Sequence, residues 1–145
     1  MEIKLKKINE KAIIPTYGTT HAAGADLYAC IEEDVVINPG ETKIIKTGIA
    51  VAIPTGYAGL IYARSGLALK RNLAPGNKVG VIDSDYRGEL MVALHNHGNI
   101  AQTVEVNERI AQLVVTPFLK VEFDETDNLD ETDRADGGFG STGTK

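Results

Sequence analysis

Short apolar stretches alternate with turn-forming residues along most of the chain. Each stretch is rich in Val, Ile, Thr or Tyr, and each is closed by Gly, Pro, Asn or Asp. Many short strands separated by turns at this spacing are typical of an all-β sandwich or barrel. The predicted strands lie in residues 43–53, 59–63, 78–82, 90–94, 103–106 and 110–118.

One short segment has the pattern of a helix instead. Residues 65–72, with the sequence SGLALKRN, combine helix-favouring Leu, Ala and Lys with a serine at the start. Serine is a preferred N-cap residue, so Ser65 is predicted to cap this helix. No helical period persists elsewhere in the chain, and a single short helix is therefore expected.

The last part of the chain has a different composition. Between residues 122 and 136 apolar residues nearly vanish and acidic residues accumulate, and a glycine-rich segment follows. A stretch of like charge with few apolar residues favours a flexible arm. We therefore divide the chain into a β domain, residues 1–121, and a C-terminal arm, residues 122–145. The arm is either a solubilising tail or a segment that orders over an anionic ligand.

Charge and composition narrow the classes of function. Of the 145 residues, 43% are hydrophobic and 24% are charged, which is typical of a folded domain. The net charge of −5 comes from the arm, because residues 121–145 hold eight acidic and two basic side chains and the rest is close to neutral. No basic face for nucleic acid is predicted.

The cysteine content and the apolar runs bear on the compartment. Cys30 is the single cysteine, so an intramolecular disulfide is excluded and a reducing interior is the natural setting. The charged first residues do not resemble a signal peptide, and no apolar run is long enough to cross a membrane. We expect a cytoplasmic protein without membrane contact.

The segment GVIDSDYRGE, residues 80–89, is the first candidate for chemistry. An apolar strand ends at Asp83, Gly88 turns the chain and a second apolar strand follows, which predicts a hairpin over residues 80–94. Asp83 and Asp85 would lie at its mouth and share one face if the strand continues. A carboxylate fixed just after a buried strand can orient a water molecule or act as a general base. The alternative is that both residues only form a turn.

A second candidate precedes the predicted helix. Arg64, Ser65 and Gly66 would bring together a guanidinium, a hydroxyl and the free amides of a helix N-terminus, which can bind an anion. The alternative is a capping serine beside a surface arginine.

Other polar residues give weaker signals on their own. Asp26 lies in a strand of small residues, and Arg109 and Gln112 lie beside an apolar strand, where a salt bridge is the simpler role for Arg109. His95 and His97 share a strand face but lack the third or fourth ligand of a zinc site.

Five segments, taken together and in order, resemble the five motifs of the trimeric dUTP nucleotidohydrolase (dUTPase) family. They are AGADLYA at 23–29, RSGLA at 64–68, GVIDSDYRGE at 80–89, ERIAQL at 108–113 and RADGGFGSTG at 134–143. Any one of them is a weak signal, but five in this order and spacing are specific. Ala63 stands where the family usually has proline and Ala135 where glycine is common, and neither position carries a reactive group.

The resemblance implies a jelly-roll-like β subunit, assembled into a homotrimer with three active sites between subunits. It also implies hydrolysis of dUTP to dUMP and pyrophosphate with Mg²⁺, which keeps uracil out of DNA. By similarity, Asp83 is the base that activates the water attacking the α-phosphorus, and Asp85 is a turn residue. The metal would be held by phosphates and water, with Asp26 in the surrounding water network and not bound to the metal directly.

The remaining site residues follow from the same resemblance. Tyr86 would pack against the deoxyribose, and main-chain groups of the hairpin would read the uracil. The arm of another subunit would close over the site, stacking an aromatic ring on the uracil. The implied residues are Asn77, Val81, Ile82 and Met91 for the base, Arg64, Ser65, Gly66 and Gln112 for the triphosphate, and Arg134, Phe139, Gly140 and Ser141 in the arm.

Three other interpretations are open at this point: a dCTP deaminase of the same fold, a regulatory binding module and a structural trimer. The complete fifth segment and the tyrosine after Asp85 favour the hydrolase over the deaminase. An inactive regulator should have lost its base or its arm, whereas Asp83, Arg64 and Phe139 are all present. A purely structural domain would not need the arm motif.

Overall fold

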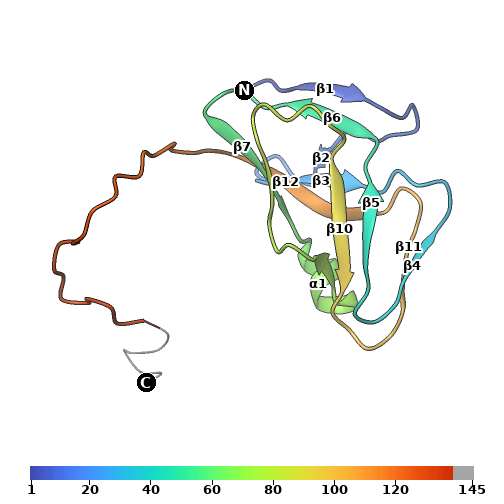
Figure 1. The fold of residues 1–145 in the computed structure, drawn as a ribbon. Helices are drawn as coiled ribbons and strands as arrows, with labels where there is room; N and C mark the ends of the chain where they lie inside the picture. Colours follow the sequence, from blue (N-terminus) through green and yellow to red (C-terminus); the bar gives the residue numbers. More distant parts are fainter. Residues whose placement is uncertain (139–145) are drawn as a thin grey trace.

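The computed structural model describes residues 1–138, which fold mainly into short β-strands (Figure 1). The prediction of an all-β chain with one short helix is confirmed for these residues. The elements are β1 (Lys4–Lys7), β2 (Thr16–Tyr17), β3 (Ala25–Tyr28), β4 (Val35–Ile37), β5 (Thr42–Lys46), β6 (Ile49–Ala52), β7 (Tyr57–Tyr62), α1 (Ser65–Arg71), β8 (Leu73–Pro75), β9 (Gly80–Ile82), β10 (Met91–Asn96), β11 (Gln102–Val104) and β12 (Arg109–Pro117).

The strands pair in antiparallel sheets that pack around one core. The largest sheet has the order β2-β3-β12-β7-β9, a second has the order β5-β10-β8, and β1-β6 and β11-β4 form two-stranded pairs. Leu27 and Ile61 from the first sheet pack with Ile45 and Leu94 from the second in this core. Both larger sheets keep open edges in the described part of the chain, so the fold is a sandwich and not a closed barrel.

The predicted strand over residues 43–53 is wrong as a single element, because the chain breaks between β5 and β6. Gly48 has a φ of +68°, a left-handed conformation that glycine adopts without steric cost. The adjacent Thr47 is buried and donates its hydroxyl hydrogen bond to the carbonyl of Leu90 at 2.6 Å. This break lets the chain leave the three-stranded sheet and pair with β1.

The helix forms where it was expected, but its predicted cap is wrong. Arg64 occupies the N-cap position in extended conformation, and no side chain caps the helix. Ser65 is already the first helical residue, so its hydroxyl makes no capping bond. Asn72 ends α1 in left-handed conformation, with a φ of 53°.

The predicted hairpin over residues 80–94 is also not a paired hairpin. β9 pairs with β7, whereas β10 pairs with β5 and β8 in the other sheet. Buried Leu90 donates its amide hydrogen to the carbonyl of Ile49 at 2.8 Å, which anchors the crossing between the sheets. The strand ends at Ile82, and the Tyr86 amide bonds the Asp83 carbonyl at 3.2 Å, so Asp85 lies in a turn and the expected shared face does not form.

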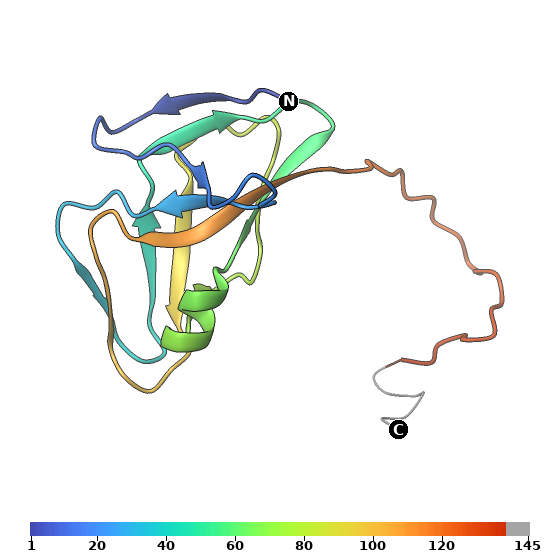
Figure 2. The ribbon, with the colours of Figure 1, turned by 180° about the vertical axis from the view of Figure 1, so that it is seen from behind.

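The arm leaves the sandwich at the end of β12. Residues 118–136 are exposed and contain no strand, and the ribbon runs away from the body in both views (Figures 1 and 2). Within residues 1–138, no helix is long and apolar enough to span a membrane.

We expect Gly48→Ala to lower the free energy of unfolding by about 2–5 kcal/mol, measured by urea denaturation. A left-handed alanine costs about 1–2 kcal/mol, and crowding in a packed interior adds about 1–3 kcal/mol. A Cβ at this position would lie 2.8 Å from both the Ala12 Cβ and the Cys30 Sγ. Gly40→Ala is the matched control, because Gly40 has a φ of +73° but open space around it. Equal losses for the two variants would contradict the crowding argument.

Candidate active site

Asp26 is the buried centre of an ion-pair network. The residue is 8% exposed, and its side chain lies between two arginines. Arg64 Nε donates to Oδ1 at 2.8 Å, and Arg109 Nη1 approaches Oδ2 at 3.3 Å. Arg64 also donates through Nη1 to the carbonyl of Arg109 at 3.2 Å. We call Asp26, Arg64, Arg109 and Gln112 the arginine cluster.

Strand register brings this cluster together. Gln112 on β12 stands opposite Asp26 on β3 and opposite Tyr62 on β7. Its side-chain amide donates to the carbonyl of Ala63 at 2.9 Å. A Cβ on Gly24 would lie 2.3 Å from Gln112 Oε1, so only glycine permits this close approach. Three segments distant in sequence therefore meet beside the start of α1.

The cluster carries net positive charge at the surface. Two guanidinium groups face one carboxylate, and the Arg109 side chain is 52% exposed. Ser65 and Gly66 are exposed in the first turn of α1, and no atom lies within 4 Å of where a Gly66 Cβ would sit. Free amides at a helix start and arginine donors are suited to an anion with several oxygens.

Sequence reasoning missed the side chain that holds the other end of α1. Arg71 donates through Nε to Gln102 Oε1 at 3.1 Å, and also to Glu108 Oε1 and to the carbonyl of Thr103. Glu108 in turn accepts from the Glu105 amide at 3.0 Å. The only signal for Arg71 in the sequence is a basic residue in the last turn of a predicted helix. Its hydrogen-bond partners lie 31 to 37 residues away in sequence and are identified only by the fold.

A second group of residues forms a pocket around the turn after β9. The pocket has a volume of about 190 Å³ and is called the loop pocket here. It is lined by Val81, Ile82, Asp83, Tyr86, Glu89 and Met91. Five of these six residues were predicted from the sequence, Asp83 as the general base and the others as substrate-binding residues. Glu89 was not predicted. Asn77 lies in the turn before β9 and is not among the lining residues.

The Tyr86 ring is held in place by the turn around it. Its hydroxyl donates to the carbonyl of Glu89 at 3.1 Å. A Cβ on Gly88 would lie 2.3 Å from the Tyr86 hydroxyl oxygen, so the ring rests directly on the Gly88 backbone. Arg87 Nη1 donates to the carbonyls of Ser84 and Tyr86 at 2.7 and 2.9 Å, which braces the same turn from outside.

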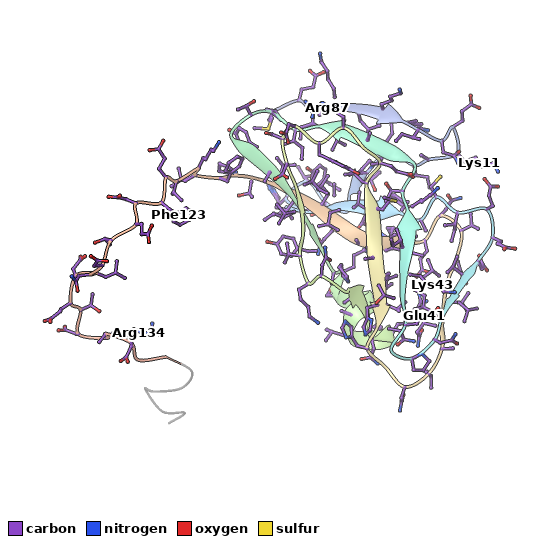
Figure 3. All side chains as sticks on the ribbon, viewed as in Figure 1. Lys11, Glu41, Lys43, Arg87, Phe123 and Arg134 are labelled. Carbon is purple, nitrogen blue, oxygen red and sulfur yellow. The ribbon has the colours of Figure 1, made fainter. Side chains whose placement is uncertain are left out.

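The arginine cluster and the loop pocket lie at opposite ends of β7. Ile82 on β9 stands opposite Gly59, which puts Asp83 level with Ala58 near the start of β7, whereas Arg64 follows the end of β7. At about 3.3 Å per residue, the chain from the level of Asp83 to Arg64 spans about 20 Å. Figure 3 shows Arg87, from the loop that follows Asp83, at the end of the molecule opposite α1.

Arg134, the predicted arm residue that the structure describes, joins neither group. Arg134 lies far from the body in Figure 3, and its Nε donates to the carbonyl of Gly137 at 2.9 Å. Phe139, Gly140 and Ser141 lie outside the described residues.

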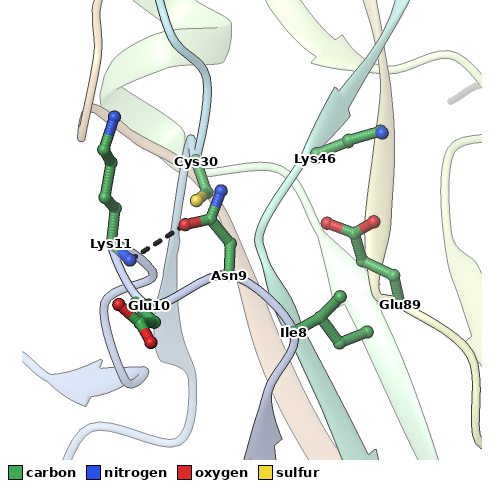
Figure 4. A pocket seen from close by; sticks show the side chains of 7 residues that line it. All are labelled: Ile8, Asn9, Glu10, Lys11, Cys30, Lys46 and Glu89. Carbon is green, nitrogen blue, oxygen red and sulfur yellow. Dashed lines mark hydrogen bonds between the residues drawn. The ribbon is translucent and has the colours of Figure 1, made fainter.

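Cys30 lines another pocket, which has a volume of about 440 Å³ (Figure 4). Burial raises the pKa of the Cys30 thiol, and the charges of Glu89 and Glu32 raise it further. A raised pKa leaves less thiolate, so Cys30 is a poor nucleophile. The Lys11 amide bonds Asn9 Oδ1 at 2.9 Å beside it, which orders the loop after β1.

The sequence pattern that defines the dUTPase family matches residues 10–143, which is nearly the whole chain. The chain belongs to the dUTPase family. A deoxyuridine 5'-triphosphate nucleotidohydrolase from Syntrophotalea carbinolica is 50% identical over 141 residues, covering 97% of this chain and 96% of that protein. A protein of the same name from Hydrogenobaculum sp. is 48% identical over 145 residues and is covered completely.

Solved dUTPase structures have the same fold. A dUTPase of Staphylococcus bacteriophage 80alpha with bound dUpNHpp matches at a TM-score of 0.89 and 29% identity, over 98% of each chain. A dUTPase from phage phi11 of S. aureus, described with a structural Mg(II) ion, matches at a TM-score of 0.81 and 25% identity. The sandwich is therefore the jelly-roll-like fold of the dUTPases, as the sequence motifs implied.

Proposed function

We propose that this chain is a dUTP diphosphatase, which hydrolyses dUTP to dUMP and pyrophosphate and so keeps uracil out of DNA. Besides membership in the dUTPase family, one observation carries the proposal: Asp83 lies on the rim of a small pocket bounded by strand backbone and a fixed tyrosine. In this proposal Asp83 is the general base that activates the water attacking the α-phosphorus.

The backbone beside the loop pocket supports a role in reading the base. β9 is an edge strand that pairs only with β7 in the described structure, so one row of its amide and carbonyl groups is free. We assign the uracil to groups near Val81, Ile82 and Met91, with Asn77 contributing from the preceding turn. A site that demands hydrogen bonds can reject the wrong base by about 10⁴–10⁵-fold, because cytosine would leave polar groups unpaired.

Tyr86 would select the sugar. Its ring is fixed between Gly88 and the hydroxyl bond to Glu89, so it cannot easily move aside for a larger ligand. A deoxyribose would pack against the ring, and a 2′-hydroxyl would clash with it.

The triphosphate would bind at the arginine cluster and the start of α1, through Arg64, Ser65, Gly66 and Gln112. Phosphoryl transfer depends mostly on positioning and charge neutralisation, and arginine forks and amides supply both. Asp26 keeps the Arg64 guanidinium oriented before the ligand arrives.

The residues fit a Mg²⁺ ion that is held by the substrate and water. Both oxygens of Asp26 face arginines, and within residues 1–138 no three His, Cys, Asp or Glu side chains gather into a metal site. Mg²⁺ commonly keeps several waters and binds substrate phosphates. When bound, it would neutralise phosphate charge, while Arg64 and Gln112 hold the oxygens in place.

The distance between the two groups supports a shared site. One copy of the chain cannot bring Asp83 and Arg64 to the same nucleotide, because Asp83 lies beside the start of β7 and Arg64 follows its end. We therefore propose a homotrimer in which the loop pocket of one copy faces the arginine cluster of another. The remaining copy would contribute its arm, residues 122–145, which follows the domain of residues 1–121. This arm would supply Arg134, Phe139, Gly140 and Ser141.

Pyrophosphate release from dUTP, dCTP, dTTP and UTP tests the activity directly. With Mg²⁺ present, we expect release from dUTP alone, because the pocket rejects the other bases and the ribose. Ammonia release from dCTP, measured in parallel, would instead identify the deaminase of the same fold. Absence of dUTP cleavage would overturn the proposal.

Asp83→Asn should abolish dUTP turnover while leaving the fold and nucleotide binding intact. Loss of a general base costs typically 10²–10⁴-fold. Asp85→Asn is the matched control, since Asp85 lies in the same turn but does not line the loop pocket. Measured kcat should fall only for Asp83→Asn; retained turnover in that variant would refute the assignment of the base.

Mixed oligomers test the sharing of sites between copies. Asp83→Asn and Arg64→Ala chains should each be inactive alone, because every site lacks one group. When the two are co-refolded in equal amounts, about a quarter of the sites should combine an intact Asp83 with an intact Arg64. Activity should recover toward that fraction. No recovery, with oligomers formed normally, would show that each site belongs to one copy.

A further inference from the structure

A basic groove of about 320 Å³ lies between β1, β6 and the turn after Asp83. It is lined by Lys4, Leu5, Lys6, Ala50, Val51, Ala52 and Arg87. Figure 3 shows Arg87 beside β1 and β6, at the end of the molecule that carries the loop pocket. The groove is not part of the proposed nucleotide site.

Strand pairing explains why the surface is hollow here. Lys4 pairs with Ala52, and Lys6 pairs with Ala50, so each long cationic side chain stands across from a small apolar one. Leu5, between the two lysines, is partly buried against the core. The alternation leaves a shallow apolar floor with ammonium groups along one side.

The positive charge of the groove is not neutralised within the described chain. Among residues 1–138, Lys4, Lys6 and Arg87 form no ion pair. Arg87 is held over the groove by two backbone carbonyls, which carry no net charge. None of the lining residues is acidic. An occupant with carboxylates and one apolar group would match this surface.

The arm contains a segment with that chemistry. In residues 127–131, DNLDE, a single leucine is flanked by Asp127 on one side and by Asp130 and Glu131 on the other. Leu129 is 86% exposed. The arm of the chain extends away from its own body in Figures 1 and 2, which leaves its own groove open and directs the segment outward.

We propose that residues 127–131 of one copy dock in the basic groove of a second copy, with Leu129 on the apolar floor and its acidic neighbours against Lys4, Lys6 and Arg87. Single exposed ion pairs are weak and screened by salt. Several carboxylates opposite three clustered cations act together, and the leucine adds apolar contact. Docking keeps the described part of the arm beside the end of the second copy that carries its loop pocket before any nucleotide binds.

A tryptophan reporter tests the docking without nucleotide. The chain has no tryptophan, so Leu129→Trp provides the single indole emitter. In the full-length protein we expect emission at shorter wavelength and weaker acrylamide quenching than in the same chain carrying Lys4→Glu and Lys6→Glu. Adding Asp127→Lys and Asp130→Lys in the arm of the chain with the reversed groove should restore the emission at shorter wavelength. Identical emission with intact and reversed grooves would overturn the proposal.

Two matched variants exclude general effects. Lys7→Glu changes a charge on the same strand outside the groove, and should leave the Leu129→Trp emission unchanged. Leu119→Trp places the reporter at a 91% exposed position before the acidic segment, and should not respond to groove reversal. At an ionic strength of about 1 M, where the Debye length falls to about 3 Å, the Leu129→Trp signal should move to that of an exposed indole.

Mixing identifies the copy that holds the segment. In a Leu129→Trp chain with the reversed groove, the segment has no intact groove to bind. Co-refolding with excess wild-type chain supplies intact grooves and adds no indole fluorescence, because the wild-type chain has no tryptophan. Recovery of the short-wavelength emission supports docking between copies. Its absence, when Leu129→Trp alone shows the docked signal, would place the segment in its own groove and overturn the proposal. These readouts are independent of dUTP hydrolysis, so the two proposals fail separately.

Discussion

A carboxylate can be buried in a protein only if cations and donors compensate for its lost hydration. Asp26 meets this requirement with Arg64 and Arg109, which come from two different parts of the chain. The ion pairs therefore fix β3, the start of α1 and β12 relative to one another. Because two cations share one anion, the arrangement also keeps positive charge at the surface, where Arg109 is half exposed. One interaction thus contributes to the fold and also to the anion site proposed above.

The loop pocket presents a different environment at the far end of β7. Its lining residues are strand residues of β9 and β10, Asp83, Glu89 and the ring of Tyr86, and the free edge of β9 lies beside it. A nucleotide needs both environments, a neutral one for the base and a cationic one for the phosphates. The strand keeps them apart within one copy, and assembly of copies brings them together in the function proposed here.

Much of this arrangement could be predicted from the sequence. The alternation of short apolar runs with turn residues gave the correct fold class, and SGLALKR gave the helix. The motif segments singled out Asp83, Arg64 and Gln112, and the structure shows Asp83 in the loop pocket and the other two in the arginine cluster, while their roles stay predictions. The pairing partners of the strands could not be predicted from the sequence. The sequence of β9 and β10 is typical of a hairpin, but buried Leu90 hydrogen-bonds to Ile49, and the chain enters another sheet there. The prediction of Ser65 as the N-cap was wrong because Arg64 occupies that position and bonds Asp26. This contact joins residues that are far apart in sequence.

The neighbouring residues Glu108 and Arg109 hold α1 at both of its ends. Glu108 binds Arg71 at the last turn, and Arg109 accepts a hydrogen bond from Arg64 just before the first. Both ends of the helix are consequently tied to two adjacent residues at the start of β12. A displacement of these two residues would act on both ends of the helix together, which favours a constant orientation of its first-turn amides relative to the arginines.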